Sequence, residues 1–184
     1  MYMNRLINVN ANEGDKVIFV GEEGYSLELE YAKKKLEIGK EYTVAYTIAN
    51  EFQATICIEE SSSDDFDTYM FIDADKKDQY IIEYLCENNM DLGLIKEEAE
   101  LILYEIKDII LDDQLISFIQ EDLSIFRSKE KALTWFNDGE EISRNEMDFK
   151  ITQDMVGKDV IDVVLENKEN CIKINDTLYL TWWL

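Results

Sequence analysis

The chain has 184 residues, of which 41 are Asp or Glu and 18 are Lys or Arg, and its net charge is −23. Such a surface repels phosphate groups, so we expect no direct binding to nucleic acid or to an anionic membrane surface. Hydrophobic residues make up 46% and aromatic residues 11% of the chain, which excludes a disordered acidic tail and suits one larger domain or two small ones. No apolar run approaches the roughly 20 residues of a membrane span, and the N-terminus lacks the basic and apolar regions of a signal peptide. We therefore expect a cytoplasmic protein.

Short β-type segments separated by turn residues dominate residues 1–78, which we expect to form the first domain. Predicted strands cover Lys16–Val20, Ser26–Tyr31, Glu41–Ala49, Phe52–Glu59 and Thr68–Ile72. The second of these alternates Leu and Glu with a period of two, and a short helix is its alternative. Together they predict a small antiparallel barrel or curled sheet. The successive segments KVIFVG, LEIGKEYTV, ATICIEE and DTYMFID resemble the small SH3-like barrels of bacterial and phage proteins. This resemblance covers less than half the chain and implies no catalytic residue.

Residues 79–184 are expected to form a second domain, which begins with an acidic helical segment. A short helix is predicted over Gln79–Glu87, with Asp78 as its N-cap. The clearest helix is Leu94–Leu111, where apolar residues recur at spacings of three and four and so share one face. Those residues are Ile95, Ala99, Ile102, Leu103, Ile106, Ile109 and Ile110. A third helix is predicted over Asp113–Asp122.

The remainder of the chain predicts a C-terminal α/β unit that ends in an antiparallel meander. Leu123–Phe126 has the composition of a strand, and Ser128 caps a helix that ends at Gly139. Three β-rich segments follow: Val160–Glu166, Cys171–Asn175 and Thr177–Trp183. The two indoles of Trp182 and Trp183 point to opposite faces of the last strand, so one of them is expected in the core. The fold class predicted for the whole chain is α+β.

Histidine is absent, which excludes Ser-His-Asp and Cys-His catalysis and histidine metal sites. No glycine-rich phosphate-binding motif is present. A carboxylate pair or a carboxylate-bound Mg²⁺ could still support catalysis, but 41 acidic residues guarantee chance pairs. We therefore predict no catalytic residue, no cofactor and no enzyme activity. The three cysteines, Cys57, Cys86 and Cys171, are expected to be buried thiols.

The acidic stretch from Glu59 to Asp78 offers the best metal candidate, with carboxylates at Asp73, Asp75 and Asp78. A calcium-binding EF-hand loop needs a glycine at its sixth position and a glutamate at its twelfth. Here those positions hold Asp78 and Tyr84, and two lysines lie inside the loop. We predict no metal site, and the segment is more typical of a strand that runs into a capped helix.

Acidity is concentrated in the middle of the chain. Residues 51–125 contain 21 Asp or Glu and four Lys, a net charge of −17, which leaves −6 for the rest. Acidic residues three or four apart on a helix have Cβ atoms about 5–6 Å from each other, and a row of such residues can imitate the phosphates of a nucleic-acid strand. The predicted partner-binding residues are Asp64, Asp65, Asp67, Asp73, Asp75, Glu97, Glu98, Glu105, Asp108 and Asp112.

These features predict an acidic inhibitor, encoded by a phage or mobile element, that binds a basic nucleic-acid-binding protein by charge mimicry. The target would be a nuclease or a CRISPR or restriction effector. In size, acidity and compactness the chain resembles DNA-mimic proteins such as anti-restriction and anti-CRISPR proteins. The alternatives are an immunity, antitoxin or adaptor protein that binds a basic toxin or partner, a small carboxylate enzyme with a divalent cation, and acidity that serves solubility alone. Exposed strand edges and the terminal Trp pair would also permit a homodimer.

Overall fold

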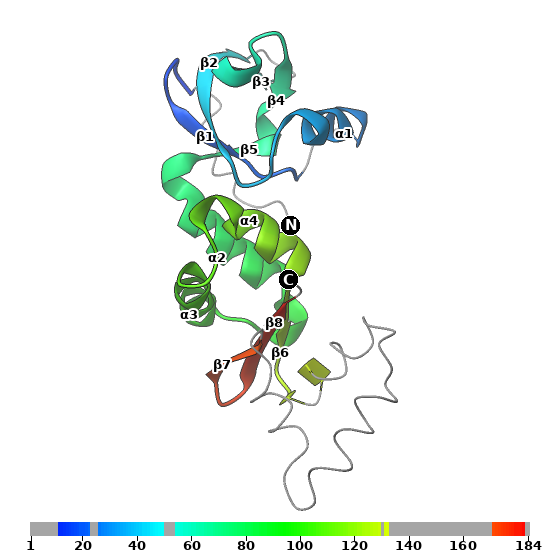
Figure 1. Cartoon of the computed structure of the whole chain (residues 1–184), viewed down its shortest axis with the longest axis vertical. Coiled ribbons are helices and arrows are strands. Elements are labelled where there is room, and N and C mark those ends of the chain that lie inside the picture. The colour runs from blue at the N-terminus through cyan, green and yellow to red at the C-terminus, as the bar shows by residue number, and fades with distance from the viewer. Residues whose placement is uncertain (1–10, 23–25, 50–53, 130, 133–170, 183–184) are drawn as a thin grey trace, which may run out of the picture. The chain divides into compact units, whose positions relative to one another are not determined.

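A computed structural model describes residues 11–22, 26–49, 54–129, 131–132 and 171–182 (Figure 1). The protein belongs to the α+β class, as predicted, because helices accompany two antiparallel sheets of five and three strands. Two compact units make up the chain, Met1–Gln120 and Glu121–Leu184. The expected boundary after residue 78 falls inside the helix α2 (Lys77–Asn88), and the division into domains 1–78 and 79–184 stays a prediction.

The first unit contains the five-stranded antiparallel sheet. Its strands are β1 (Lys16–Phe19), β2 (Glu41–Ala49), β3 (Ala54–Ile58), β4 (Asp65–Asp67) and β5 (Phe71–Asp73), in the order β4-β3-β2-β1-β5. A bulge between Val44 and Tyr46 interrupts the register of β2 with β3, and such bulges bend a strand. Figure 1 shows the sheet curling around its own interior. The described strands thus form the small curled antiparallel sheet that the sequence predicts.

Short 3₁₀ turns connect the later strands: η1 (Glu59–Ser61), η2 (Thr68–Met70) and η3 (Ala74–Lys76). The strand expected over Thr68–Ile72 therefore begins three residues late, because its first residues form η2. The Asp67 carboxylate accepts a hydrogen bond from the Tyr69 backbone amide at 3.0 Å. This contact caps η2 and holds the chain in a turn where β propensity alone predicts a strand.

The prediction of a strand over Ser26–Tyr31 is wrong, and its helical alternative is correct. Residues Ser26–Lys35 form the helix α1. Leu29 packs against the core together with the buried residues Ala32 and Leu36, which is a helical spacing of three and four. Leu27, the other residue of the apparent alternation, is 79% exposed. Tertiary packing therefore selects the helical period.

The core of the curled sheet is built from alternate strand residues. Phe71 lies at its centre, with ring centroids 5.5 Å from Phe19 and 6.2 Å from Phe66. The buried members of this cluster are Ala11, Val17, Phe19, Ala32, Leu36, Tyr42, Val44, Ile56, Ile58, Phe66, Met70 and Phe71. Ile18 and Ile72 are also buried, although they lie outside the cluster. Because Ile18 alternates with Val17 and Phe19, β1 is covered on both of its faces.

The helical part of the first unit begins with α2, η4 (Met90–Leu92) and α3 (Lys96–Lys107). The two helices form an antiparallel hairpin, in which Asp78 near the start of α2 pairs with Lys107 at the end of α3 at 2.6 Å. Asp78 is therefore in the first turn of α2 rather than at its N-cap, which is Lys76. α3 ends four residues earlier than predicted, and Ile95 and Ile109 are exposed rather than part of its buried face.

The predicted helix over Asp113–Asp122 is a succession of three short helical turns. These are η5 (Asp112–Gln114), α4 (Leu115–Ser117) and the π-helical turn η6 (Phe118–Asp122). The sequence pattern of this segment also predicts that Leu115, Ile116, Phe118 and Ile119 point inward, and all four are buried. Gln120 donates hydrogen bonds to the Val20 carbonyl and to the Tyr80 hydroxyl, both at 3.1 Å. These bonds attach the last helical turns to the residue that follows β1 and to α2.

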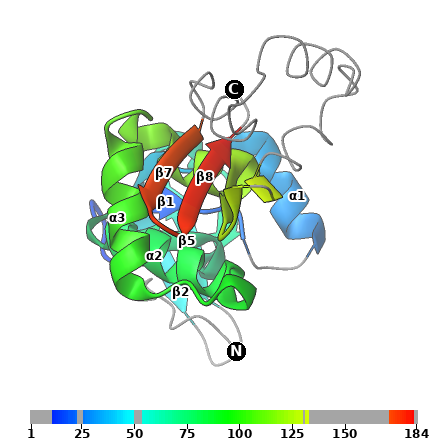
Figure 2. The same cartoon turned by 90° about the horizontal axis from the view of Figure 1, so that it is seen from below.

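The second unit contains a three-stranded antiparallel sheet of β6 (Leu123–Phe126), β7 (Cys171–Asn175) and β8 (Leu178–Trp182), in the order β6-β8-β7. Figure 2 shows β7 beside β8. Trp182 is 2% exposed, which confirms that one indole of the terminal pair packs in the core. Trp183, the expected strand Val160–Glu166 and most of the helix expected between Ser128 and Gly139 lie outside the described residues.

Candidate protein-binding surface

Of the three acidic residues at β4, Asp64 and Asp67 stabilise local structure through hydrogen bonds. Asp64 accepts hydrogen bonds from the Ser61 hydroxyl at 2.6 Å and from the Tyr31 hydroxyl at 2.5 Å. The hydrogen bond from Ser61 is the main cause that lowers the pKa of the Asp64 carboxyl, and the bond from Tyr31 lowers it further. Asp67 is buried and caps η2. Asp65 alone is exposed, so it is the residue of this group that a partner can reach.

Asp73 and Asp75 line a hollow of about 610 Å³ together with Asp15, Lys16 and Glu41. The hollow lies where β1 meets β2 and β5. Its lysine is 3.7 Å from Glu41, and Asp73 pairs with Lys76 at 2.7 Å. The four carboxylates outnumber the two ammonium groups of Lys16 and Lys76, which gives this hollow a negative potential that favours a cationic group.

The outer face of α3 is mixed rather than uniformly acidic. With 3.6 residues per turn, Glu97, Leu101, Tyr104 and Asp108 follow one line along the helix, opposite the buried residues Ala99, Ile102, Leu103 and Ile106. Leu101 is 49% and Tyr104 is 67% exposed. The expected row of carboxylates is therefore interrupted by two large side chains.

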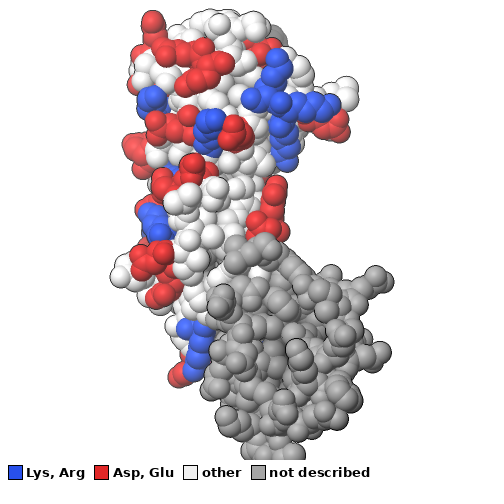
Figure 3. Space-filling view, in the orientation of Figure 1, with Lys and Arg blue, Asp and Glu red and all other residues white. Residues whose placement is uncertain are grey.

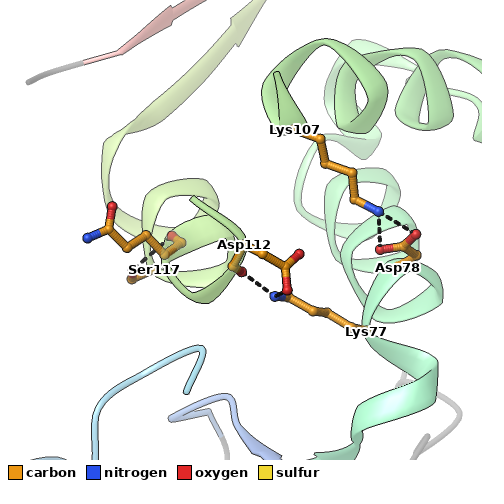
Figure 4. A network of polar contacts seen from close by, with 6 residues as sticks. Lys77, Asp78, Lys107, Asp112 and Ser117 are labelled. Atoms are coloured by element: carbon orange, nitrogen blue, oxygen red, sulfur yellow. Dashed lines mark hydrogen bonds and ion pairs between the residues drawn. The ribbon is translucent and has the colours of Figure 1, made fainter. Parts of the chain in front are cut away.

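The other acidic residues predicted near α3 have different surroundings. Glu98 is half-buried, and its carboxylate accepts a hydrogen bond from the Ile95 amide at 3.5 Å, which caps the helix. Glu105 is exposed. Asp112 is exposed but lies 2.9 Å from the ammonium of Lys77, whose side chain is only 10% exposed. Asp112 is thus the counterion of a buried lysine (Figure 4).

Lysines around the helical hairpin are paired with its own acids. Lys107 bonds both carboxylate oxygens of Asp78, at 2.6 and 2.7 Å (Figure 4). Lys96 lies 3.8 Å from Glu100. Within the described part of the chain, no ion pair or side-chain hydrogen bond engages Glu97, Glu105 or Asp108. Their carboxylates are therefore free to act on a partner.

A groove of about 530 Å³ runs between α2 and α3. It is lined by Gln79, Ile82, Glu83, Cys86 and Glu87 of α2 and by Lys96 and Glu100 of α3. Burial raises the pKa of the Cys86 thiol, and nearby carboxylates raise it further. Those carboxylates belong to Glu83, Glu87, Glu97 and Glu98. Cys57 is buried as expected, whereas Cys86 is half-buried, so the expectation of a buried thiol there is wrong.

Sequence reasoning missed the groove, although its signal is present. The α2 residues that line it recur at spacings of three and one, which places them on a single helix face.

Figure 3 shows acidic side chains spread over the visible face of the first unit, and basic side chains gathered at α1, which carries Lys33, Lys34 and Lys35 in its last turn.

Among the described residues, no group of three or more Cys, Asp or Glu is arranged to hold a metal ion. Nor does that part of the chain contain a helix long and apolar enough to cross a membrane. No protein-family model matches the sequence, and comparison with curated proteins and with solved structures finds no match.

Proposed function

We propose that the chain is an acidic inhibitor that binds a basic nucleic-acid-binding protein, a nuclease or a CRISPR or restriction effector, by nucleic-acid charge mimicry. It would be encoded by a phage or mobile element, act in the cytoplasm, and need no catalytic residue or cofactor. One observation carries the proposal. Residues 51–125 hold a net charge of −17, and the exposed carboxylates of Glu97, Glu105 and Asp108 are unpaired in the described structure while nearby lysines are paired.

The geometry of α3 suits this role. Glu97 and Asp108 are separated by 11 residues, or about 16 Å along the helix axis. One DNA strand carries roughly five phosphates over that length. A basic groove that accepts phosphates can therefore meet both carboxylates at once, and opposite fields would accelerate the encounter. Asp65 and the hollow at Asp73 and Asp75 add negative potential elsewhere on the first unit.

A second candidate function is that of an immunity, antitoxin or adaptor protein that binds a basic toxin or partner. The exposure of Leu101 and Tyr104 favours it, because buried aromatic and aliphatic anchors give affinity that does not depend on salt. The two functions share a basic partner and differ in whether nucleic acid competes for the same surface.

The experiment uses the tagged chain in a nuclease-treated lysate of a bacterial host, with bound proteins identified by mass spectrometry. The inhibitor function predicts a basic nucleic-acid-binding protein that is lost as salt rises from about 50 to 200 mM. Added duplex DNA should compete, and the chain should inhibit the captured enzyme. A partner that resists salt and ignores DNA would support the second function instead. Capture of no basic protein at either salt concentration would refute both.

Charge reversal locates the surface. The double variant Glu97→Lys and Asp108→Lys should weaken capture about tenfold or more, since close interfacial charges are strongly coupled. Glu28→Lys with Glu30→Lys on α1 is the matched control, because these exposed residues give the same change in net charge. Equal losses in the two double variants would mean that overall charge, rather than α3, governs binding.

A further inference from the structure

Resting on the proposed function, we infer that the groove between α2 and α3, with the adjoining outer face of α3, is a docking site for a cationic amphipathic helix of the partner protein. The groove has three features that suit this occupant: its shape, its apolar surface and its charge.

The shape fits a helix. The lining residues of α2 run from Gln79 to Glu87 on one face, a length of about 12 Å or two helical turns. Two antiparallel helices offer a third helix a valley parallel to their axes, and recognition of this kind uses apolar anchors spaced at i, i+3 or i+4, and i+7. Ile82 and Cys86 supply apolar surface within the groove.

The apolar residues outside the groove have no partner in the core. Ala99, Ile102, Leu103 and Ile106 already fill the inward face of α3, so Leu101 and Tyr104 are left to solvent. These two lie three residues apart, and Tyr104 follows Glu100 by one helical turn, beside the groove. Exposed apolar surface rimmed by charged groups is characteristic of a protein-binding site.

The charge selects a cationic occupant. Glu83, Glu87 and Glu100 line the groove against the single lysine Lys96, and that lysine pairs with Glu100. A Lys or Arg of the partner can lay its aliphatic stem on Ile82 and direct its charged end to these carboxylates. A second copy of this chain fits poorly, because it would bring its own net charge of −23 to the same acidic surface.

The test uses synthetic probes in place of the unidentified partner. The first peptide is a helix with leucines at spacings of three and four and with arginines and lysines at its other positions. The second has the same composition in scrambled order, so that it keeps its charge and loses its apolar face. Binding to the full chain is measured by isothermal titration calorimetry at low and moderate salt. Protection of Cys86 from alkylation, quantified by peptide mapping, reports whether the groove is occupied.

The amphipathic peptide should bind about tenfold more tightly than the scrambled one and should protect Cys86. Leu101→Gln with Tyr104→Ser should reduce this preference about tenfold. Glu87→Lys with Glu97→Lys should weaken both peptides more than the control Glu28→Lys with Glu30→Lys does. These positions are exposed, so the variants should keep the wild-type circular dichroism spectrum and melting temperature.

The outcomes separate the two proposals. If neither peptide binds at low salt, recognition of a basic partner is wrong, and the docking site is wrong with it. If the peptides bind equally and leave Cys86 reactive, a basic partner is recognised elsewhere, and only the docking site is overturned. If sedimentation shows a dimer that Leu101→Gln with Tyr104→Ser converts to a monomer, a second copy is the occupant, which also overturns the inference.

Discussion

Replacing Asp112 with asparagine should destabilise the first unit, because it removes the counterion of Lys77. The Lys77 side chain is 10% exposed, and its Nζ lies 2.9 Å from a carboxylate oxygen of Asp112. The same ammonium donates a hydrogen bond to the backbone carbonyl of Asp112. The pair joins the start of α2 to η5, which are 35 residues apart in sequence. Figure 4 shows this contact beside the Asp78–Lys107 pair.

The magnitude follows from the unequal burial of the two partners. Removing one member of a fully buried ion pair costs roughly 3–5 kcal/mol, whereas an exposed pair contributes about 0–1 kcal/mol. Asp112 is 80% exposed, so water screens the interaction and can replace part of it. The backbone hydrogen bond also survives the substitution. We therefore expect a loss of about 1–2 kcal/mol in the free energy of unfolding, or a fall in Tm of roughly 2–8 °C.

Urea denaturation of matched variants measures this loss. Asp113→Asn is the control, because Asp113 is an exposed neighbour in the same turn and its replacement makes the same change in charge. Lys77→Met keeps an apolar stem without the charge and should alter stability by less than about 1.5 kcal/mol. In the Lys77→Met background, Asp112→Asn should have no further effect.

Two results would refute the reasoning. Equal stability of the Asp112→Asn and Asp113→Asn variants would show that the carboxylate does not stabilise Lys77. A full loss of stability from Asp112→Asn in the Lys77→Met background would assign the effect to something other than the pair. If the reasoning holds, Asp112 belongs to the folding of the first unit, and weakened partner binding in its variants must be corrected for unfolding.

Three further predictions concern the first unit. Tyr80→Phe removes a buried hydroxyl that bonds the Glu22 carboxylate at 2.9 Å, and should lower the free energy of unfolding in urea by about 1–3 kcal/mol. Gly39→Ala places a Cβ 2.6 Å from a backbone carbonyl of η5 at a φ of 83°, and should cost more than about 1 kcal/mol in the same assay. Because the folded-state pKa of Asp64 is lowered, mainly by Ser61, its stabilising contribution is present above its unfolded value of about 3.9 and is lost as pH falls through the folded value. Ser61→Ala should raise that folded pKa in an NMR titration.

The first two of these predictions have a control variant in the same unit. Tyr84→Phe tests whether loss of any half-buried tyrosine hydroxyl has the effect of Tyr80→Phe. Gly14→Ala tests backbone strain alone, since Gly14 has a φ of 89° and no atom within 4 Å of an added Cβ. If Gly39→Ala is as stable as the wild type, the close approach of Gly39 to η5 is contradicted. If the Asp64 titration is unchanged in Ser61→Ala, the hydrogen bond from Ser61 does not lower the Asp64 pKa.

The strands β1, β2 and β3 are predictable from the sequence because their signals are local, whereas β4 was not predicted. β2 is rich in β-branched and aromatic residues, and at its start the buried Tyr42 and Val44 alternate with more accessible residues. The Asn175 side chain makes the turn before β8 by accepting a hydrogen bond from the Thr177 amide. α1 is different. The apolar alternation over its first residues favours a strand, and only its contact with the core, through Leu29 and Ala32, reveals a helix. The deciding interaction is tertiary and cannot be found in a short window.

The composition of the α3 surface was predictable in part. The apolar residues assigned to its inward face include Ala99, Ile102, Leu103 and Ile106, and these are buried. The same periodicity leaves Leu101 and Tyr104 on the outer face, so their exposure could have been read from the spacing. The early end of α3 could not have been predicted from the spacing. The apolar pattern continues to Ile110, whereas the helix ends at Lys107.

The pairing of individual carboxylates is beyond local sequence reasoning, and it changes the meaning of the acidic segment. A carboxylate bonded within the fold, such as Asp64 or Asp67, stabilises local structure. An unpaired one, such as Glu97 or Asp108, keeps its full charge for a partner. Reversal of either kind changes the net charge equally. The first should therefore lower Tm, and the second should lower affinity at unchanged Tm, so the two measurements together divide the acidic residues into those that build the fold and those that the proposed function uses.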